Sequence, residues 1–228
     1  VATELTATEE KAEELARNIH ATREKAAPTF NDAIQTTLAR LGMPEARFVV
    51  QLTPAPALTP TGGDEIDFLF TANGNFAPQK VERIASGGEI SRVMLALKAL
   101  LAHRMELPTI IFDEIDTGVS GRIADAMGEI IASLSARMQV VDITHLPQVA
   151  SKGTAHFVVY KRDGRTSITR LSEAERVTEI AKMLSGSEIT DAAVAQARIL
   201  LGRRETEAQP PREAAPAAPK GKESGLLF

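Results

Sequence analysis

The sequence has no cysteine, and its apolar residues fall into short runs. Without cysteine, neither a disulfide framework nor a cysteine-ligated metal site is possible. No apolar run approaches the roughly 20 residues that a membrane-spanning helix needs, and the first residues lack the composition of a secretory signal peptide. We therefore expect a cytoplasmic protein with no membrane partner.

An excess of positive charge is also missing. The 228 residues carry a formal net charge of −4, and a quarter of them are charged. Nucleic-acid binding draws much of its strength from basic residues that neutralise phosphates, so this chain is not expected to bind nucleic acid strongly through its overall charge. The length suits one substantial domain with appendages.

A third absence concerns phosphate binding. No stretch has the spacing Gly, four residues, then Gly-Lys-Ser or Gly-Lys-Thr, which forms the phosphate-binding Walker A loop. The nearest match, Gly221-Lys222-Glu223, lacks the hydroxyl, the first glycine and a preceding strand. The chain therefore contains no phosphate cradle of this kind.

What the sequence does contain begins with residues 85–89, ASGGE, directly before the apolar run Ile90–Met105. A helix N-terminus carries partial positive charge and unpaired N–H groups, so an anion can bind there. Gly87 and Gly88 would allow a phosphate to approach the backbone closely. Ser86 and Glu89 also suit an ordinary capping box, so a capped helix without a ligand stays open as an alternative.

Two carboxylates end the apolar run of residues 109–114, TIIFDE. The run is typical of a strand buried on both faces, and ligands of open α/β sheets gather at the carboxyl ends of such strands. Asp113 would hold Mg²⁺ through water, and Glu114 would orient and deprotonate an attacking water. The alternative is an acidic turn that caps the next helix. Residues 140–145, VVDITH, form a second apolar strand and end in His145, on the same predicted edge of the sheet.

The order of these pieces, with residues 116–121 (DTGVSG) between the two strands, resembles the signature motif, Walker B strand, D-loop and switch histidine of an ATP-binding-cassette (ABC) ATPase. The wording ASGGEISRVMLALK, IFDEIDTGVSG and THLPQVA resembles the RecN family, SMC-like ATPases of bacterial DNA double-strand-break repair. The resemblance covers residues 27–201. It implies an α/β fold: the C-terminal lobe of an ABC/SMC-type ATPase head, a mixed sheet flanked by helices, with a coiled-coil stub at the N-terminus.

The same resemblance implies ATP and Mg²⁺ as cofactors and a site shared between polypeptide segments. Asp113, Glu114 and His145, the last at the γ-phosphate, would act on ATP held by the Walker A loop of the N-terminal half of the same head. Residues serving the nucleotide of a second head, in an ATP-dependent homodimer, would be Ser86, Gly87, Gly88 and Glu89, together with Asp116, Gly118 and Ser120 of the D-loop. DNA would be a partner of the full-length protein, and its location the nucleoid.

We expect three parts along the chain. Residues 1–27 carry a thin heptad seam and would end a longer coiled coil on its returning arm. Residues 28–202 would form the C-terminal half of the head, inactive without the Walker A half. Residues 203–228 are rich in Pro, Ala, Glu and Lys and are expected to be disordered. The rival functions are a transporter-type cassette and a degenerate head that dimerises without hydrolysis.

Periodicity and turn residues predict the elements of the head. Pro28 either kinks the first helix or starts a new one, which ends before Gly42. A Pro- and Thr-rich loop is expected over residues 53–63, and Asp163-Gly164 is expected to turn a hairpin. Basic residues cluster at this hairpin; a solvated turn is the favoured interpretation, and a DNA contact stays open as the alternative. Further helices are predicted over residues 87–104, 121–136, 146–152, 173–184 and 190–201, and strands over 48–52, 64–70, 109–114, 140–145, 155–161 and 166–171.

Overall fold

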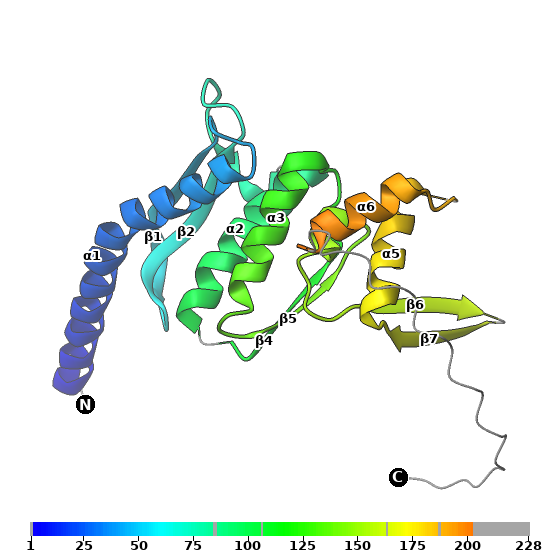
Figure 1. The fold of residues 1–228 in the computed structure, drawn as a ribbon. Coiled ribbons are helices and arrows are strands. Elements are labelled where there is room, and N and C mark those ends of the chain that lie inside the picture. The colour runs from blue at the N-terminus through cyan, green and yellow to red at the C-terminus, as the bar shows by residue number, and fades with distance from the viewer. Residues whose placement is uncertain (1, 84–85, 106, 163, 187, 203–228) are drawn as a thin grey trace, which may run out of the picture.

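The computed structural model describes residues 2–83, 86–105, 107–162, 164–186 and 188–202 (Figure 1). Helices and strands alternate along the chain much as the sequence predicts. In chain order they are α1 (Ala2–Arg40), β1 (Arg47–Thr59), β2 (Gly62–Thr71), β3 (Gln79–Lys80), a 3₁₀ turn (Val81–Arg83), α2 (Gly87–Met105), β4 (Thr109–Asp113), α3 (Gly121–Leu134), β5 (Gln139–Ile143), α4 (Pro147–Ala150), β6 (Phe157–Arg162), β7 (Arg165–Arg170), α5 (Glu173–Ser185) and α6 (Asp191–Leu200). The tail expected to be disordered, residues 203–228, lies outside the described residues.

Helix α1 is a single 39-residue helix that passes through Pro28. Its first half projects away from the body (Figure 1), and Leu15 on the predicted seam is 54% exposed. Its last turns are buried, with Ile34 and Leu38 packed against β1, β2 and α2. Gly42 follows with φ +80°, the left-handed conformation of the predicted C-cap. The helix therefore has one end in the core and one long exposed end.

The predicted loop over residues 53–63 is wrong. Strands β1 and β2 continue as an antiparallel hairpin, with Thr53 opposite Glu65 and Pro54 opposite Asp64, and an irregularity before Thr59. Proline is tolerated in a strand where its missing N–H faces an unpaired edge, and in the described residues β1 pairs only with β2. Composition alone does not show that β1 is an edge strand, which is why a loop was predicted here.

The extended hairpin is fastened to α1 by one carboxylate. Asp64 accepts hydrogen bonds from Arg23 at 3.0 Å and faces His20 Nδ1 at 2.7 Å. The hydrogen bond from the Arg23 guanidinium, with a smaller contribution from His20, holds the pKa of Asp64 below its usual value. The exposed half of α1 is thereby fixed in direction relative to the hairpin.

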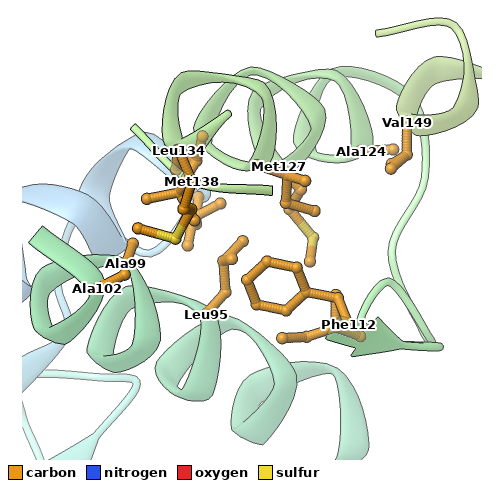
Figure 2. Packing of buried hydrophobic residues seen from close by; sticks show 13 residues of the cluster. Leu95, Ala99, Ala102, Phe112, Ala124, Met127, Leu134, Met138 and Val149 are labelled. Atoms are coloured by element: carbon orange, nitrogen blue, oxygen red, sulfur yellow. The ribbon is translucent and has the colours of Figure 1, made fainter. Parts of the chain in front are cut away.

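Helices α2 and α3 pack on a parallel pair of strands, β4 and β5. Phe112 of β4 is fully buried beneath the two helices, beside Leu95 of α2 and Met127 of α3 (Figure 2). Alternating positions of β4 and β5 face this core, and the apolar stripe of α3 closes it. The α/β fold predicted from the sequence is confirmed, although its strands form three small sheets, one three-stranded and two two-stranded, in the described residues.

The prediction that residues 109–114 are buried on both faces is wrong. Ile111 is 60% exposed, and Val141 and Ile143 on β5 are exposed beside it. The register places Ile111 next to Val141 and Asp113 next to Ile143, so these side chains share one face. Helices α2 and α3 cover only the opposite face. An apolar strand sequence shows that both faces can be buried, but it does not show which element covers each face. Within the described residues, one face of this sheet is uncovered.

The C-terminal part begins with the short helix α4, followed by the hairpin β6–β7 and the helix pair α5–α6. The hairpin extends from the body (Figure 1), and every residue of β7 is exposed. Ser172 and Glu175 form a capping box at the start of α5, and Ile180 and Ala197 bury the contact between α5 and α6. In the part of the chain that is described, no helix is both long and apolar enough to cross a membrane.

Candidate nucleotide site

The two predicted catalytic carboxylates lie where β4 ends. Asp113 is the last residue of the strand, and Glu114 begins the turn that follows; both are exposed. The Glu114 N–H donates to the Ile143 carbonyl at 3.0 Å, and its own carbonyl accepts from the Thr117 N–H and hydroxyl. The parallel pairing of β4 with β5 thus brings both strand ends to one edge, as predicted.

Glu114 has an unusual backbone conformation. Its φ is +48°, the only positive φ of a non-glycine residue among those described. This left-handed region costs a residue with a Cβ on the order of 1–3 kcal/mol, and such strain gathers at functional sites. The hydrogen bonds on both sides of the peptide hold the conformation. Glutamate therefore occupies a position where glycine or asparagine would be easier to accommodate.

A small hollow of about 210 Å³ lies beside these carboxylates. It is bounded by α2 and by the end of β4, and its lining includes Ser91, Lys98, Asp113 and Glu114. The Lys98 ammonium also lies 5.6 Å from the centre of the buried Phe112 ring. The sequence prediction did not select Lys98; the available signal was a lone cation inside the apolar run of α2.

The signature residues and the D-loop lie against each other. Ser86 is exposed just before α2, and a side chain at Gly87 would enter open space. A Cβ on Gly88 would lie 3.2 Å from the Gly118 carbonyl oxygen, which is a tight contact, and Gly118 has φ +78°, which favours glycine there. Arg92 donates to the Gly88 carbonyl at 2.9 Å and to the Leu41 carbonyl at 3.1 Å, which ties the start of α2 to the end of α1.

Asp116 is the predicted site residue whose surroundings differ most from expectation. We expected it to serve the nucleotide of a second head, together with Gly118 and Ser120; those two are exposed, whereas Asp116 is 1% exposed. One carboxylate oxygen accepts a hydrogen bond from the Thr144 hydroxyl. The other lies 3.8 Å from His145 Nδ1. Its carboxylate thus points to the end of β5, because the turn after Glu114 folds the D-loop back over that strand.

Sequence reasoning also missed Asp142, which occupies the buried side of β5 next to Phe112. Burial, and after it the nearby negative charge of Asp116, raise the pKa of Asp142 to about 6. Neither Asp142 Oδ1 nor Asp116 Oδ1 has a hydrogen-bond partner in the described residues. The signal in the sequence was a carboxylate within the otherwise apolar run VVDIT.

The donor set can be compared with what Mg²⁺ requires. No group of three or more His, Cys, Asp or Glu side chains in the described residues is placed to hold a metal ion by itself. Mg²⁺ in nucleotide sites is bound by one or two carboxylates together with waters and phosphate oxygens. The exposed carboxylate of Asp113 at the strand end fits this kind of site. It would be one ligand, and the nucleotide would supply others.

The fold of this chain recurs in solved structures of SMC ATPase heads. One, described as concerning "ATP-driven dimerization and DNA stimulated activation of SMC ATPases", aligns with 75% of this chain and 99% of its own, at a TM-score of 0.54 and 19% identity. The Smc head domain of Pyrococcus yayanosii, with a coiled coil and joint, aligns with 79% of this chain and 34% of its own, at a TM-score of 0.59 and 18% identity. The fold is that of an SMC-type ATPase head with its coiled coil.

Sequence similarity narrows the class to one family. DNA repair protein RecN of Haemophilus influenzae is 39% identical over 197 residues, which are 84% of this chain and 35% of that protein. RecN of Bacillus subtilis is 45% identical over 148 residues, 63% of this chain and 26% of that protein. The chain belongs to the RecN family, and it spans about a third of the length of the curated relatives it matches. No family model matches it.

Proposed function

We propose that this chain is the C-terminal half of a RecN-type ATPase head, which hydrolyses Mg²⁺-ATP during DNA double-strand-break repair. The observation that carries the proposal is the strand edge: Asp113 ends β4 and the strained Glu114 follows it, while His145 comes two residues after Ile143, the end of β5 that pairs with Asp113. The RecN relatives are named as DNA repair proteins, which supports this setting and a nucleoid location in the cytoplasm.

Each side chain has a separate task in the proposed reaction. Asp113 would hold the Mg²⁺ of Mg²⁺-ATP, and that ion, when bound, neutralises charge on the phosphates. Glu114 would orient the attacking water and take its proton, and His145 would contact the γ-phosphate. Phosphoryl transfer depends mainly on positioning and charge neutralisation, so a dispersed set of side chains is sufficient.

The N-terminal half of the head would supply the Walker A loop. Two open apolar surfaces support this partner. One is the uncovered face of β4 and β5, with Ile111, Val141 and Ile143. The other is a groove of about 680 Å³ between α1, the β1–β2 hairpin and α2, where Phe68 and Met94 are exposed. Large exposed apolar patches mark interaction sites, so both surfaces suit a partner segment. Because the chain has no Walker A loop of its own, we infer that it is inactive alone.

The signature residues would serve the nucleotide of a second head. Ser86, Gly87 and Glu89 stand at the accessible start of α2, and Gly118 joins them to the D-loop. The description of one SMC structure names ATP-driven dimerization, which supports an ATP-dependent homodimer here. A full-length protein would bring DNA to this dimer. None of the similar proteins named above is a transporter, so the cassette of a membrane transporter is not favoured.

The deciding experiment compares Glu114→Gln with the unaltered sequence in this chain combined with a Walker A-bearing N-terminal half. Glutamine keeps the size of the side chain but cannot accept the proton, so turnover should fall by about a hundredfold to ten-thousandfold. ATP should still bind and should hold the heads together. ATPase assays and sizing with light scattering measure both effects.

The controls separate catalysis from assembly. This chain alone should bind ATP weakly and hydrolyse it negligibly; micromolar affinity would contradict the shared site. Near-normal turnover of Glu114→Gln would show that another group activates the water. A complex of the two unaltered halves that binds ATP without hydrolysing it would instead favour a dimerisation module.

A further inference from the structure

A buried carboxylate links the D-loop to the switch histidine. Asp116 lies three residues after Asp113, and its side chain is almost completely excluded from solvent. It accepts a hydrogen bond from Thr144, the residue before His145, and its second oxygen lies 3.8 Å from His145 Nδ1. Thr144 in turn accepts a hydrogen bond at 2.9 Å from the Leu146 N–H. One carboxylate therefore reaches both the backbone turn that carries the histidine and the ring itself.

The geometry distinguishes the two ring nitrogens. Nδ1 is the nitrogen nearest Asp116, while the His145 side chain is 63% exposed. A carboxylate beside Nδ1 favours a proton there, and this leaves Nε2 as the nitrogen free to meet a substrate. In catalytic sites a third group commonly orients a histidine in this manner. The separation of 3.8 Å exceeds a hydrogen bond, so a direct contact requires a small rotation of the exposed ring.

We propose that Asp116 is a positioning residue: it fixes the orientation and tautomer of His145 through its own carboxylate and through the hydroxyl of Thr144. This role rests on the proposed ATPase function and deepens it. Asp116 acts from beneath the site, on the histidine, and makes no contact with the nucleotide itself. The D-loop contacts Gly88 of the signature through Gly118. A shift of the D-loop at that contact would therefore change the orientation and tautomer of His145 through Asp116.

Because Asp116 is buried, its carboxylate needs hydrogen-bond donors or a nearby positive charge. An ionised carboxylate removed from water is costly unless hydrogen bonds or an opposite charge compensate it. Thr144 satisfies one oxygen, and the other has no hydrogen-bond partner in the described residues. Asp142 on β5 repels it, and among the described residues its ionic contact is with His145, which offers a donor. The free oxygen is thus available to the ring.

A double-mutant cycle in the full-length protein tests the coupling. Asp116→Asn and His145→Ala should each lower kcat about tenfold or more, with the KM for ATP little changed. Because both substitutions disable one unit, the double variant should be no slower than His145→Ala. Asp32→Asn, which removes an exposed carboxylate on α1, is the matched control. A full additional loss from Asp116→Asn in the His145→Ala background would overturn the proposal.

A spectroscopic readout does not depend on turnover. The ring ¹⁵N shifts of His145 in this chain should report a proton on Nδ1, and the proton should move to Nε2 in Asp116→Asn. Unchanged shifts would overturn the proposal even if the protein were an active ATPase. Correct shifts in a full-length protein that lacks ATPase activity would instead remove the proposed function and leave the positioning contact standing.

Thr144 provides a second route to the same answer if Asp116→Asn does not fold. Thr144→Val keeps the shape of the side chain and deletes the hydroxyl that donates to Asp116. It should lower kcat in the same direction, and Thr144→Ser, which restores a hydroxyl, should recover most of the loss. Equal turnover of the valine and serine variants would show that the hydroxyl does not position the histidine.

Discussion

The two faces of the β4–β5 sheet differ in what covers them. On the closed face, Phe112 is fully buried under α2 and α3, together with Leu95 and Met127 (Figure 2). On the open face, Ile111 and Ile143 are more than half exposed, although they are as apolar as the residues of the closed face. Both faces of the strands therefore carry large apolar side chains, and the described part of the chain covers only one face.

This difference separates the fold of the chain from the assembly of the head. The closed face is sufficient to hold β4 and β5 in parallel register and to bring Asp113, Glu114 and His145 to one edge. The open face contributes no packing within the described residues, and a contiguous exposed apolar patch is typical of a site where a partner binds. We infer that the closed face builds the site and the open face recruits the partner that completes it.

The largest expected effect tests the difference between the two faces directly, by truncating one side chain on each face and comparing the loss of stability. Phe112→Ala should destabilise the chain by about 3–5 kcal/mol, because it leaves a cavity under two helices. Ile111→Ala on the open face should cost well under about 1 kcal/mol, as surface substitutions usually do. Chemical denaturation of both variants measures the difference. Equal losses would show that the open face is covered in solution.

The converse experiment asks what the open face does when a partner is present. Ile111→Asp should leave the folding of this chain unaltered but weaken its binding to the N-terminal half by about tenfold to a hundredfold, since a charge would be buried without a partner. Titration calorimetry of the two segments gives the affinity. The control is Ile168→Asp on the exposed hairpin strand β7. Should both variants bind equally well, the partner does not use the open face.

The smallest expected effect concerns the stability contribution of a carboxylate on the closed face, and it depends on pH. Asp142 lies there, and its raised pKa of about 6 means that folding favours its protonated form. This stabilisation is complete below the unfolded pKa of about 4 and is lost as the pH rises through about 6. Asp142 is incompletely buried, so solvent screening reduces the expected gain of Asp142→Asn to about 1–2 kcal/mol above about pH 7.

Denaturation curves across the acid range test this sign. The difference in unfolding free energy between Asp142→Asn and the unaltered chain should be smallest near about pH 4 and should grow as the pH rises. Asp64→Asn serves as a contrasting control, because Arg23 lowers the pKa of Asp64 and the trend is reversed there. A constant difference across the range would mean that folding does not shift the pKa of Asp142.

Much of the site could be predicted from the sequence because its motifs are local. A glycine pair before an apolar helix and two strands that end in Asp113-Glu114 and His145 each follow from neighbouring residues, and the parallel pairing then placed both strand ends together. Helix lengths were predicted closely for the same reason. The extension of β1 was not, because a proline is compatible with a strand only where one edge is free.

What the sequence by itself determined, then, is the order of the elements, the family and the residues with chemistry to offer. Tertiary structure alone decided which of those residues face solvent. It buried Asp116 beneath His145, left Ile111 uncovered, and placed Glu114 in a left-handed conformation. Burial and backbone strain depend on contacts between segments far apart in the chain, and no periodicity within a single segment records what another segment will cover.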